Sequence, residues 1–127
     1  IKGGRRVLIA EDEPNIVISL EFLLKEAGHA VTVARDGAEA LRLIGAARPD
    51  LIILDVMLPS VNGFEVCRRL RGNPETQDIR ILMLTARGRE SEVEKGLTAG
   101  ADAYMTKPFA TKELIRIVAG LLHPAKA

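Results

Sequence analysis

The sequence has almost no excess charge and few aromatic side chains. The chain has 18 Lys and Arg residues and 17 Asp and Glu residues, which leaves a formal net charge of +1. It contains one tyrosine, three phenylalanines and no tryptophan. A nearly neutral chain has no overall field that attracts nucleic acid or an anionic membrane, and few rings are available to stack on bases. We therefore expect no direct nucleic-acid binding and no membrane association.

Cysteine and long apolar runs are also scarce. The single cysteine, Cys67, excludes an internal disulfide and is expected to be a small apolar filler on its helix. No apolar run approaches the roughly 20 residues of a membrane span, and nothing before Arg5 resembles a signal peptide. These absences predict a soluble protein of a reducing compartment, the cytoplasm. The first residue is Ile1 rather than methionine, as in a trimmed or partial chain.

Several motifs of known enzymes and binding modules are missing. The chain has no glycine-rich loop ending in Gly-Lys-Ser or Gly-Lys-Thr, no G-x-G-x-x-G after a strand, and no His or Cys cluster for zinc. The arginines at 68, 69 and 71, with those at 5 and 6, could suggest a basic nucleic-acid patch. Without aromatic neighbours we interpret the three between 68 and 71 as a solvated helix face.

Five short apolar runs alternate with five segments of helical periodicity. The third run, Leu51 to Leu54, is apolar throughout, which is typical of a strand buried on both faces in a parallel sheet. Pro14 suits a first helical turn, and Asp36 with Glu39, Asn62 with Glu65, and Thr111 are expected to cap later helices. A further helix is expected around residues 90–98. Strands are predicted at residues 7–10, 30–34, 51–55, 79–84 and 103–105.

This alternation, with short loops and no internal repeat, predicts one α/β domain over residues 1–127, a doubly wound five-stranded parallel sheet with five helices. Polar residues collect at the carboxyl ends of its strands, where ligands bind in such sheets. Alone, Asp55 could cap its loop, Thr85 could satisfy its own loop and Lys107 could be solvated, but together they indicate a site. The residues concerned are Glu11, Asp12, Asp55, Thr85 and Lys107.

Three of these are carboxylates, which repel one another unless a cation is present. Mg²⁺ prefers oxygen ligands and is commonly held by one or two carboxylates beside a phosphate. Lys107 and Thr85 suit the oxygens of an anion. A carboxylate can accept a phosphoryl group as an acyl phosphate, and Asp55 is the best candidate because its strand is buried and rigid.

Four segments in this order resemble the receiver domains of bacterial two-component response regulators, over roughly residues 5–122. The resemblance implies the flavodoxin-like strand order 2-1-3-4-5 and transfer of a phosphoryl group to Asp55 from the phosphohistidine of a sensor histidine kinase or phosphotransfer protein. It implies a phosphoacceptor that promotes its own phosphorylation and dephosphorylation, not a turnover enzyme. The segments are residues 7–13, 54–59 with 62–63, 83–86, and 100–104 with 107–109.

The resemblance also assigns roles. Glu11, Asp12, Asp55 and the backbone carbonyl of Met57 would hold Mg²⁺. The phosphoryl oxygens would be bound by the Thr85 hydroxyl, the Ala86 amide and Lys107, and the Lys107–Pro108 bond would be cis. Thr85 and Tyr104 would form the switch, although Tyr104 alone is equally consistent with packing.

The main alternative is a Mg²⁺-dependent phosphatase that forms an aspartyl phosphate. Such enzymes usually carry a second acid two residues after the nucleophile, where this chain has Met57. Receivers commonly use the positions of Met57 and Arg87 to flank the hydrolytic water. Since methionine cannot orient a water as an amide or acid can, we expect a long-lived phosphorylated state.

Some features resemble the receivers of winged-helix transcription factors, which dimerise through charge pairs on the fourth helix, fifth strand and fifth helix. Of those charges only Glu113 is present here. We expect instead an apolar partner-binding or self-association face around Leu97, Tyr104 and Ile115. On the last helix, Leu114, Val118 and Leu121 are expected to face the core, with Ile115 and Leu122 at the rim. The substituted positions are Val93, Thr98, Ala103, Ile117 and Ala119.

Overall fold

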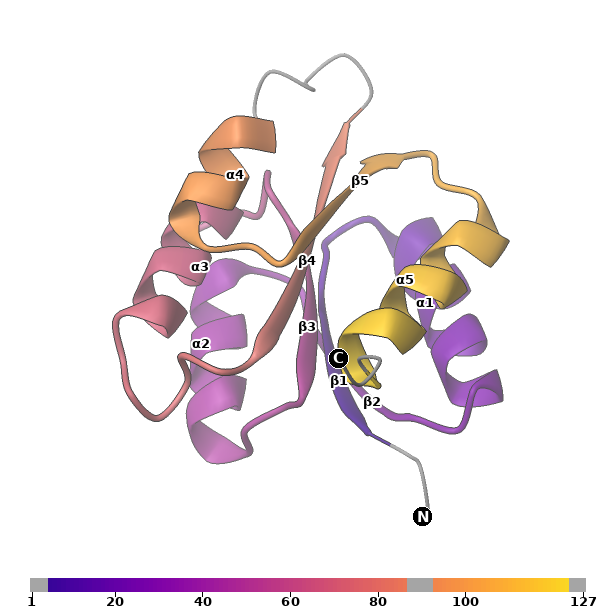
Figure 1. The fold of residues 1–127 in the computed structure, drawn as a ribbon, viewed down its shortest axis with the longest axis horizontal. Coiled ribbons are helices and arrows are strands. Elements are labelled where there is room, and N and C mark those ends of the chain that lie inside the picture. Colours follow the sequence, from indigo (N-terminus) through magenta and orange to yellow (C-terminus); the bar gives the residue numbers. More distant parts are fainter. Residues whose placement is uncertain (1–4, 87–92, 124–127) are drawn as a thin grey trace.

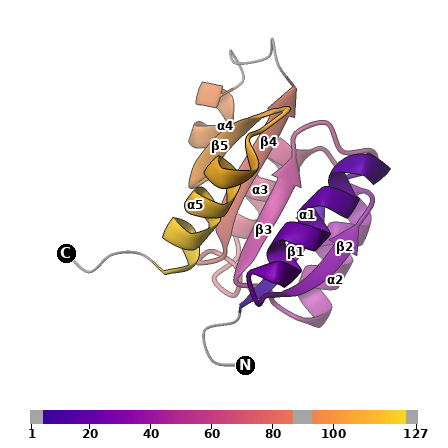
Figure 2. The same cartoon turned by 90° about the vertical axis from the view of Figure 1, so that its right-hand side faces the viewer.

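The computed structural model describes residues 5–86 and 93–123. One parallel sheet has the strand order β2-β1-β3-β4-β5, as the family resemblance implies. Helices α1 and α5 cover one face of the sheet, and α2, α3 and α4 cover the other (Figures 1 and 2). The strands are β1 Arg6–Ala10, β2 Ala30–Ala34, β3 Leu51–Asp55, β4 Arg80–Ala86 and β5 Ala103–Lys107. The helices are α1 Pro14–Glu26, α2 Gly37–Ala46, α3 Gly63–Arg71, α4 Val93–Ala99 and α5 Thr111–Leu122.

The core has two halves, one on each side of the sheet. Every residue of β3 is buried, and alternate side chains point into opposite halves: Ile52 toward α2 and α3, Ile53 toward α1 and α5. Each fully buried leucine or isoleucine contributes about 1.5–3 kcal/mol relative to an exposed one. The central strand is therefore held rigidly from both faces, as its unbroken apolar sequence predicts.

The helix starts agree only in part with the capping predictions. Pro14 opens α1, and Asp36 accepts a hydrogen bond from the Glu39 amide at 2.8 Å, while Glu39 accepts one from the Arg35 amide at 2.8 Å. The prediction that Thr111 caps α5 is wrong. Ala110 has the extended backbone of the capping position, so Thr111 is already the first helical residue.

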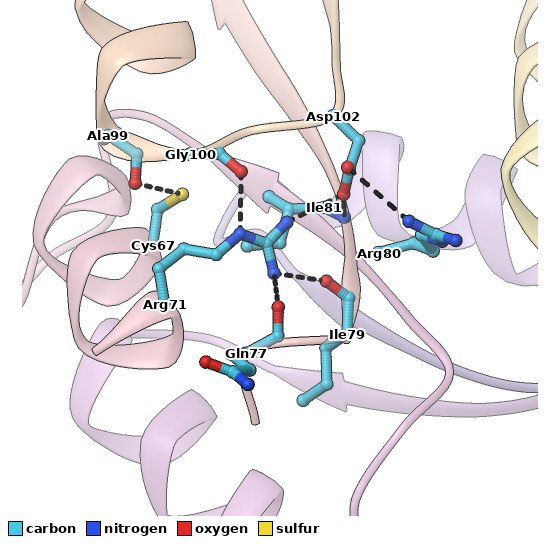
Figure 3. A network of polar contacts seen from close by, with 9 residues as sticks. All are labelled: Cys67, Arg71, Gln77, Ile79, Arg80, Ile81, Ala99, Gly100 and Asp102. Atoms are coloured by element: carbon cyan, nitrogen blue, oxygen red, sulfur yellow. Dashed lines mark hydrogen bonds and ion pairs between the residues drawn. The ribbon is translucent and has the colours of Figure 1, made fainter. Parts of the chain in front are cut away.

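Helix α3 begins as predicted, with the Asn62 side chain accepting a hydrogen bond from the Glu65 amide at 3.0 Å. Arg68 and Arg69 lie exposed beside Glu65, as expected for a solvated helix face. Arg71 does not, and here the prediction is wrong. Its guanidinium lies between the end of α3, the start of β4 and the loop before β5 (Figure 3).

Arg71 uses all three of its nitrogens. Nε donates to the Gly100 carbonyl at 2.8 Å, and Nη2 donates to Asp102 Oδ2 at 2.8 Å. Nη1 donates to the carbonyls of Gln77 at 2.8 Å and Ile79 at 2.6 Å. These bonds tie three segments together at the amino edge of the sheet.

Cys67 lies near this cluster and is buried, as predicted. Its thiol donates to the Ala99 carbonyl at 3.3 Å (Figure 3). Burial raises the pKa of the thiol to about 11, so the side chain stays protonated at neutral pH.

Helix α5 is rotated relative to the expectation. Leu114, Val118 and Leu122 are buried, whereas Ile115 and Leu121 are only half-buried. The buried residues are spaced by four, so the ridge that packs on the sheet follows i, i+4 and i+8. Leu122 is therefore a core residue, and its assignment to the rim is wrong. Among the described residues no helix has the length and hydropathy needed to cross a membrane.

Candidate functional site

The parallel strands bring polar side chains from β1, β3, β4 and β5 to their common carboxyl edge, at the top of the sheet in Figure 1. Glu11 follows β1 directly, and Asp55 is the last residue of β3. Thr85 and Lys107 lie inside β4 and β5, which run further than the sequence predicts because Ala86 pairs with Lys107. Lys107 Nζ lies 3.3 Å from Glu11 Oε1 and 3.4 Å from Asp55 Oδ1.

The acidic side chains are close enough to share a cation. Glu11, Asp12 and Asp55 each offer a carboxylate oxygen, and these oxygens lie within 4.8 Å of one another. Glu11 and Asp55 are buried, while Asp12 is exposed. Three carboxylates against one ammonium leave excess negative charge, and an all-oxygen set suits Mg²⁺ better than zinc. The residues present therefore fit a magnesium ion.

The site electrostatics follow from this crowding. Burial raises the pKa of Glu11, and the negative charge of Asp55 raises it further. Burial alone would lower the pKa of Lys107, but attraction by Asp55 and then Glu11 outweighs it, so the pKa is raised. Lys107 is therefore an ammonium at neutral pH, held between two carboxylates.

Asp55 is fixed by its own loop and by a neighbouring strand. The Met57 amide donates to Asp55 Oδ1 at 3.2 Å, and the Val56 amide donates to the Leu84 carbonyl at 3.0 Å. The Met57 side chain is 55% exposed. Its backbone amide, not its side chain, orients the Asp55 carboxylate.

Two supports of this loop were not found from the sequence. A Cβ on Gly63 would lie 2.5 Å from the Asp55 carbonyl oxygen, so only glycine lets α3 begin this close to the acid. The start of α2 holds the same loop, because the Gly37 amide donates to the Pro59 carbonyl at 3.0 Å and Ser60 Oγ accepts from the Ala38 amide at 3.1 Å. The Asn62-Gly63 pair was a signal for the first support, but no local pattern indicates the second.

Thr85 carries a buried hydroxyl with unused hydrogen-bonding capacity. The residue is 1% exposed, and among the described residues its Oγ1 is the one fully buried side-chain polar atom without a partner. Leaving such a group unsatisfied costs about 1–3 kcal/mol. A ligand oxygen at this point would recover that energy.

The remaining candidate residues lie close by. Ala86 ends β4, and the Lys107–Pro108 bond is cis, as the family resemblance implies. Tyr104 lies on β5 beside Met83 and is half-buried. Arg87 lies outside the described residues. A groove of about 520 Å³ opens beside Lys107, between α1 and the loop after β5, and its lining includes Ile16, Ser19, Pro108 and Phe109.

An open parallel sheet with acids, a buried hydroxyl and a lysine at its carboxyl edge is the arrangement of the α/β proteins that bind ligands at this edge. The family model described as response regulator receiver domain matches residues 7–119. The chain therefore belongs to the response regulator receiver domain family.

Individual relatives agree. The chain is 46% identical over 121 residues to the phosphate regulon transcriptional regulatory protein PhoB of Rhizobium meliloti (strain 1021), an alignment that covers 95% of this chain and 53% of PhoB. The chain thus spans about half the length of the curated relatives it matches.

Solved structures show the same fold. A protein from Chloroflexus aurantiacus J-10-fl described as a response regulator has a TM-score of 0.90 and 40% identity, covering 94% of this chain and 98% of that one. The receiver domain of the sensor histidine kinase PA1611 from Pseudomonas aeruginosa PAO1 has a TM-score of 0.85 and 32% identity, with the same two coverages. That structure has a magnesium ion in its active-site cleft.

Proposed function

We propose that residues 1–127 form a single receiver domain in which Asp55 accepts a phosphoryl group in a Mg²⁺-dependent reaction. The observation that carries this proposal is the contact of Lys107 Nζ with both Glu11 and Asp55, beside the unpartnered Thr85 hydroxyl. Glu11, Asp12, Asp55 and the Met57 carbonyl would hold the metal, in keeping with the clustered carboxylates and the magnesium of the PA1611 receiver. Bound there, Mg²⁺ would offset the charge of the carboxylates and of the incoming phosphoryl group.

The donor is the phosphohistidine of a sensor histidine kinase or phosphotransfer protein. An oxygen of the Asp55 carboxylate attacks phosphorus, and the phosphorus–nitrogen bond to the donor imidazole breaks with its electron pair going to nitrogen. The imidazole takes one proton from water and leaves as the neutral ring. Lys107 neutralises a phosphoryl oxygen that would otherwise face two acids. The groove beside Lys107 gives a donor protein room to approach.

The product reorganises the site. The phosphoryl group adds charge and acceptor oxygens at Asp55, and the Thr85 hydroxyl and Ala86 amide donate to them. A hydrogen bond to a charged group contributes about 1.5–3 kcal/mol, enough to move Thr85 and, through it, Tyr104. The surface around Leu97, Tyr104 and Ile115 then binds a downstream protein or a second copy.

The same site hydrolyses its acyl phosphate slowly, so the protein is a switch and not a turnover enzyme. This signalling role places it in the cytoplasm, where a thiol such as Cys67 stays reduced. The alternative, a Mg²⁺-dependent aspartyl-phosphate phosphatase, predicts steady turnover of a small phosphate ester, whereas the receiver predicts a single stoichiometric phosphorylation.

The test is intact-mass analysis after incubation with acetyl phosphate. Wild type should gain one phosphoryl group with Mg²⁺ and none after chelation, and Asp55→Asn should gain none. Asp78→Asn, which changes an exposed acid away from the site, should behave as wild type. Equal modification of the Asp55→Asn variant would overturn the proposal.

A further inference from the structure

Gly96 lies in the middle of α4, where glycine is among the least favourable residues. A Cβ at this position would lie 2.2 Å from Tyr104 Cε2, 3.1 Å from Tyr104 Cδ2 and 3.1 Å from Met83 Sδ. The helical glycines Gly45 in α2 and Gly120 in α5 differ, because a Cβ on either would meet nothing within 4 Å. Gly96 is thus the one whose missing side chain makes room for the Tyr104 ring.

The Tyr104 ring that occupies this space is connected to Thr85 through the neighbouring strand β4. Tyr104 pairs with Met83 in the sheet, and Met83 is two residues before Thr85 on β4. Side chains two apart on a strand point to the same face. The path from the Thr85 hydroxyl to the backbone of α4 therefore runs along one face of the sheet, past Met83 and the Tyr104 ring.

We infer that Gly96 is a positioning residue of the switch, an inference that rests on the proposed function of Thr85 and Tyr104. By having no side chain, it lets the Tyr104 ring lie directly on the α4 backbone, so that the ring and the helix respond together to events at Asp55. A methyl group at 96 denies the ring this position. The ring then rests elsewhere in every state, and the Leu97–Tyr104 surface loses its dependence on phosphorylation.

A Cβ at position 96 would clash with the outer atoms of the Tyr104 ring, which can rotate about its side-chain bonds. It would also crowd the sulfur of Met83, which belongs to a flexible side chain. Neither contact involves backbone. The fold should therefore survive Gly96→Ala, with the ring displaced.

The chain itself supplies the probe, because Tyr104 is its only tyrosine and there is no tryptophan. Tyrosine emission and its quenching by acrylamide therefore report on this ring alone. In wild type, Mg²⁺ with beryllofluoride, a phosphoryl mimic, should change both signals. In Gly96→Ala the starting signals should differ from wild type and most of the change should be lost, while acetyl phosphate still modifies Asp55 to the wild-type extent.

Gly120→Ala is the matched control, because it adds the same methyl group at a helical position where the new Cβ would meet nothing within 4 Å. This variant should respond as wild type. A normal response of Gly96→Ala, with wild type also responding, would overturn the inference alone. No response in wild type would overturn both the inference and the proposed switch. Unmodified Asp55 in all variants would instead mark failure of the proposed phosphoacceptor.

If Gly96→Ala proves too unstable for fluorescence, denaturant unfolding in a Tyr104→Ala background decides the matter. The inference requires that Gly96→Ala destabilise the wild-type background more than the Tyr104→Ala background, because the ring is what the methyl group meets. Equal loss in both backgrounds would mean that the ring is not the obstacle.

Discussion

The two edges of the sheet each contain a partly buried basic side chain among oxygen atoms, but the two clusters are built differently. At the amino edge, Arg71 donates to three carbonyl oxygens and pairs with Asp102, which also accepts the Ile81 amide at 2.8 Å. At the carboxyl edge, Lys107 contacts Glu11 and Asp55, and Asp12 adds a third carboxylate nearby. In the first cluster one carboxylate lies between two guanidinium groups, because Arg80 Nη1 is also 3.9 Å from Asp102 Oδ1 (Figure 3). In the second cluster three carboxylates surround one ammonium.

This difference separates a network that satisfies its own polar groups from one that leaves charge and a hydroxyl unsatisfied. An ion pair removed from water stabilises a fold best when its remaining hydrogen-bonding groups find partners, and around Arg71 three carbonyl oxygens accept from the guanidinium beside Asp102. The carboxyl edge keeps excess negative charge and an orphaned Thr85 hydroxyl, both of which cost stability. Under the proposed function, the same features would let that edge take up a cation and an anionic group, so the fold would be stabilised at one end and reactive at the other.

The largest expected effect is at the amino edge. Arg71→Met should lower the free energy of unfolding by about 2–4 kcal/mol, because Asp102 and three carbonyl oxygens lose their donor. Urea unfolding measures this loss. Arg69→Met removes an exposed arginine from the same helix and should change stability by under about 0.5 kcal/mol. Equal effects of the two substitutions would show that the Arg71 network is not a structural clamp.

At the carboxyl edge, a bound metal ion should supply the positive charge that the side chains lack. Mg²⁺ at ten times its dissociation constant should raise the unfolding free energy of wild type by about 1.4 kcal/mol. Asp55→Asn should gain much less, because a ligand with full negative charge is gone. The measurement is a urea or thermal unfolding series with increasing Mg²⁺, with a chelated, metal-free buffer as reference. A metal-induced gain of the same size in both proteins would place the metal elsewhere.

Without metal, Asp55→Asn should stabilise the protein by about 0.5–1 kcal/mol at neutral pH, since one of the repelling carboxylates is removed. The folded protein binds the Glu11 proton more tightly than the unfolded chain, because the pKa of Glu11 is raised above its ordinary value of 4.5. Stability from this group is therefore present at low pH and lost as pH rises through the raised pKa. Because Asp55 contributes to that shift, the advantage of the variant should shrink below about pH 4.5. An advantage that grows on acidification would contradict this reasoning.

A smaller effect is expected at Met57, whose exposed side chain cannot orient a hydrolytic water. Met57→Asn should speed loss of the phosphoryl group about threefold, less than 1 kcal/mol of the barrier. Intact-mass analysis over time after removal of the donor gives the rate. Phe22→Asn changes another exposed apolar residue, on α1, and is the control that should leave the rate unchanged. Slower hydrolysis in Met57→Asn would refute the explanation of a long lifetime.

Sequence pattern predicted the carboxyl edge of the sheet far better than the amino edge. The strands and the convergence of Glu11, Asp55, Thr85 and Lys107 follow from local apolar runs and from parallel topology, which brings all carboxyl ends together, whereas the strand order came from the family resemblance. The Arg71 network has no such signal, because its acceptors are backbone carbonyls brought near only by the fold.

Two further misses have the same cause. Thr111 and Leu122 were misplaced because the turn before α5 and the rotation of that helix depend on packing against the sheet, which local periodicity does not fix. The space that Gly96 leaves for Tyr104 is likewise a contact between distant segments.

The outer surface of α4, β5 and α5 gives a third region to compare, because uncharged side chains occupy several positions between its charged residues. Thr98 and Ala119 are exposed and uncharged, and Glu113 is paired within α5 to Arg116. Leu97 is 51% exposed, and Ile115 and Tyr104 are half-buried.

An association through this surface depends on apolar contact, which salt does not screen. Sedimentation of the beryllofluoride-treated protein should therefore show a dissociation constant that changes by less than about threefold between 0.1 and 1 M salt, although the Debye length falls from about 10 to 3 Å. Steep dissociation with rising ionic strength would mean that charge pairs, as at the two edges of the sheet, hold the assembly together.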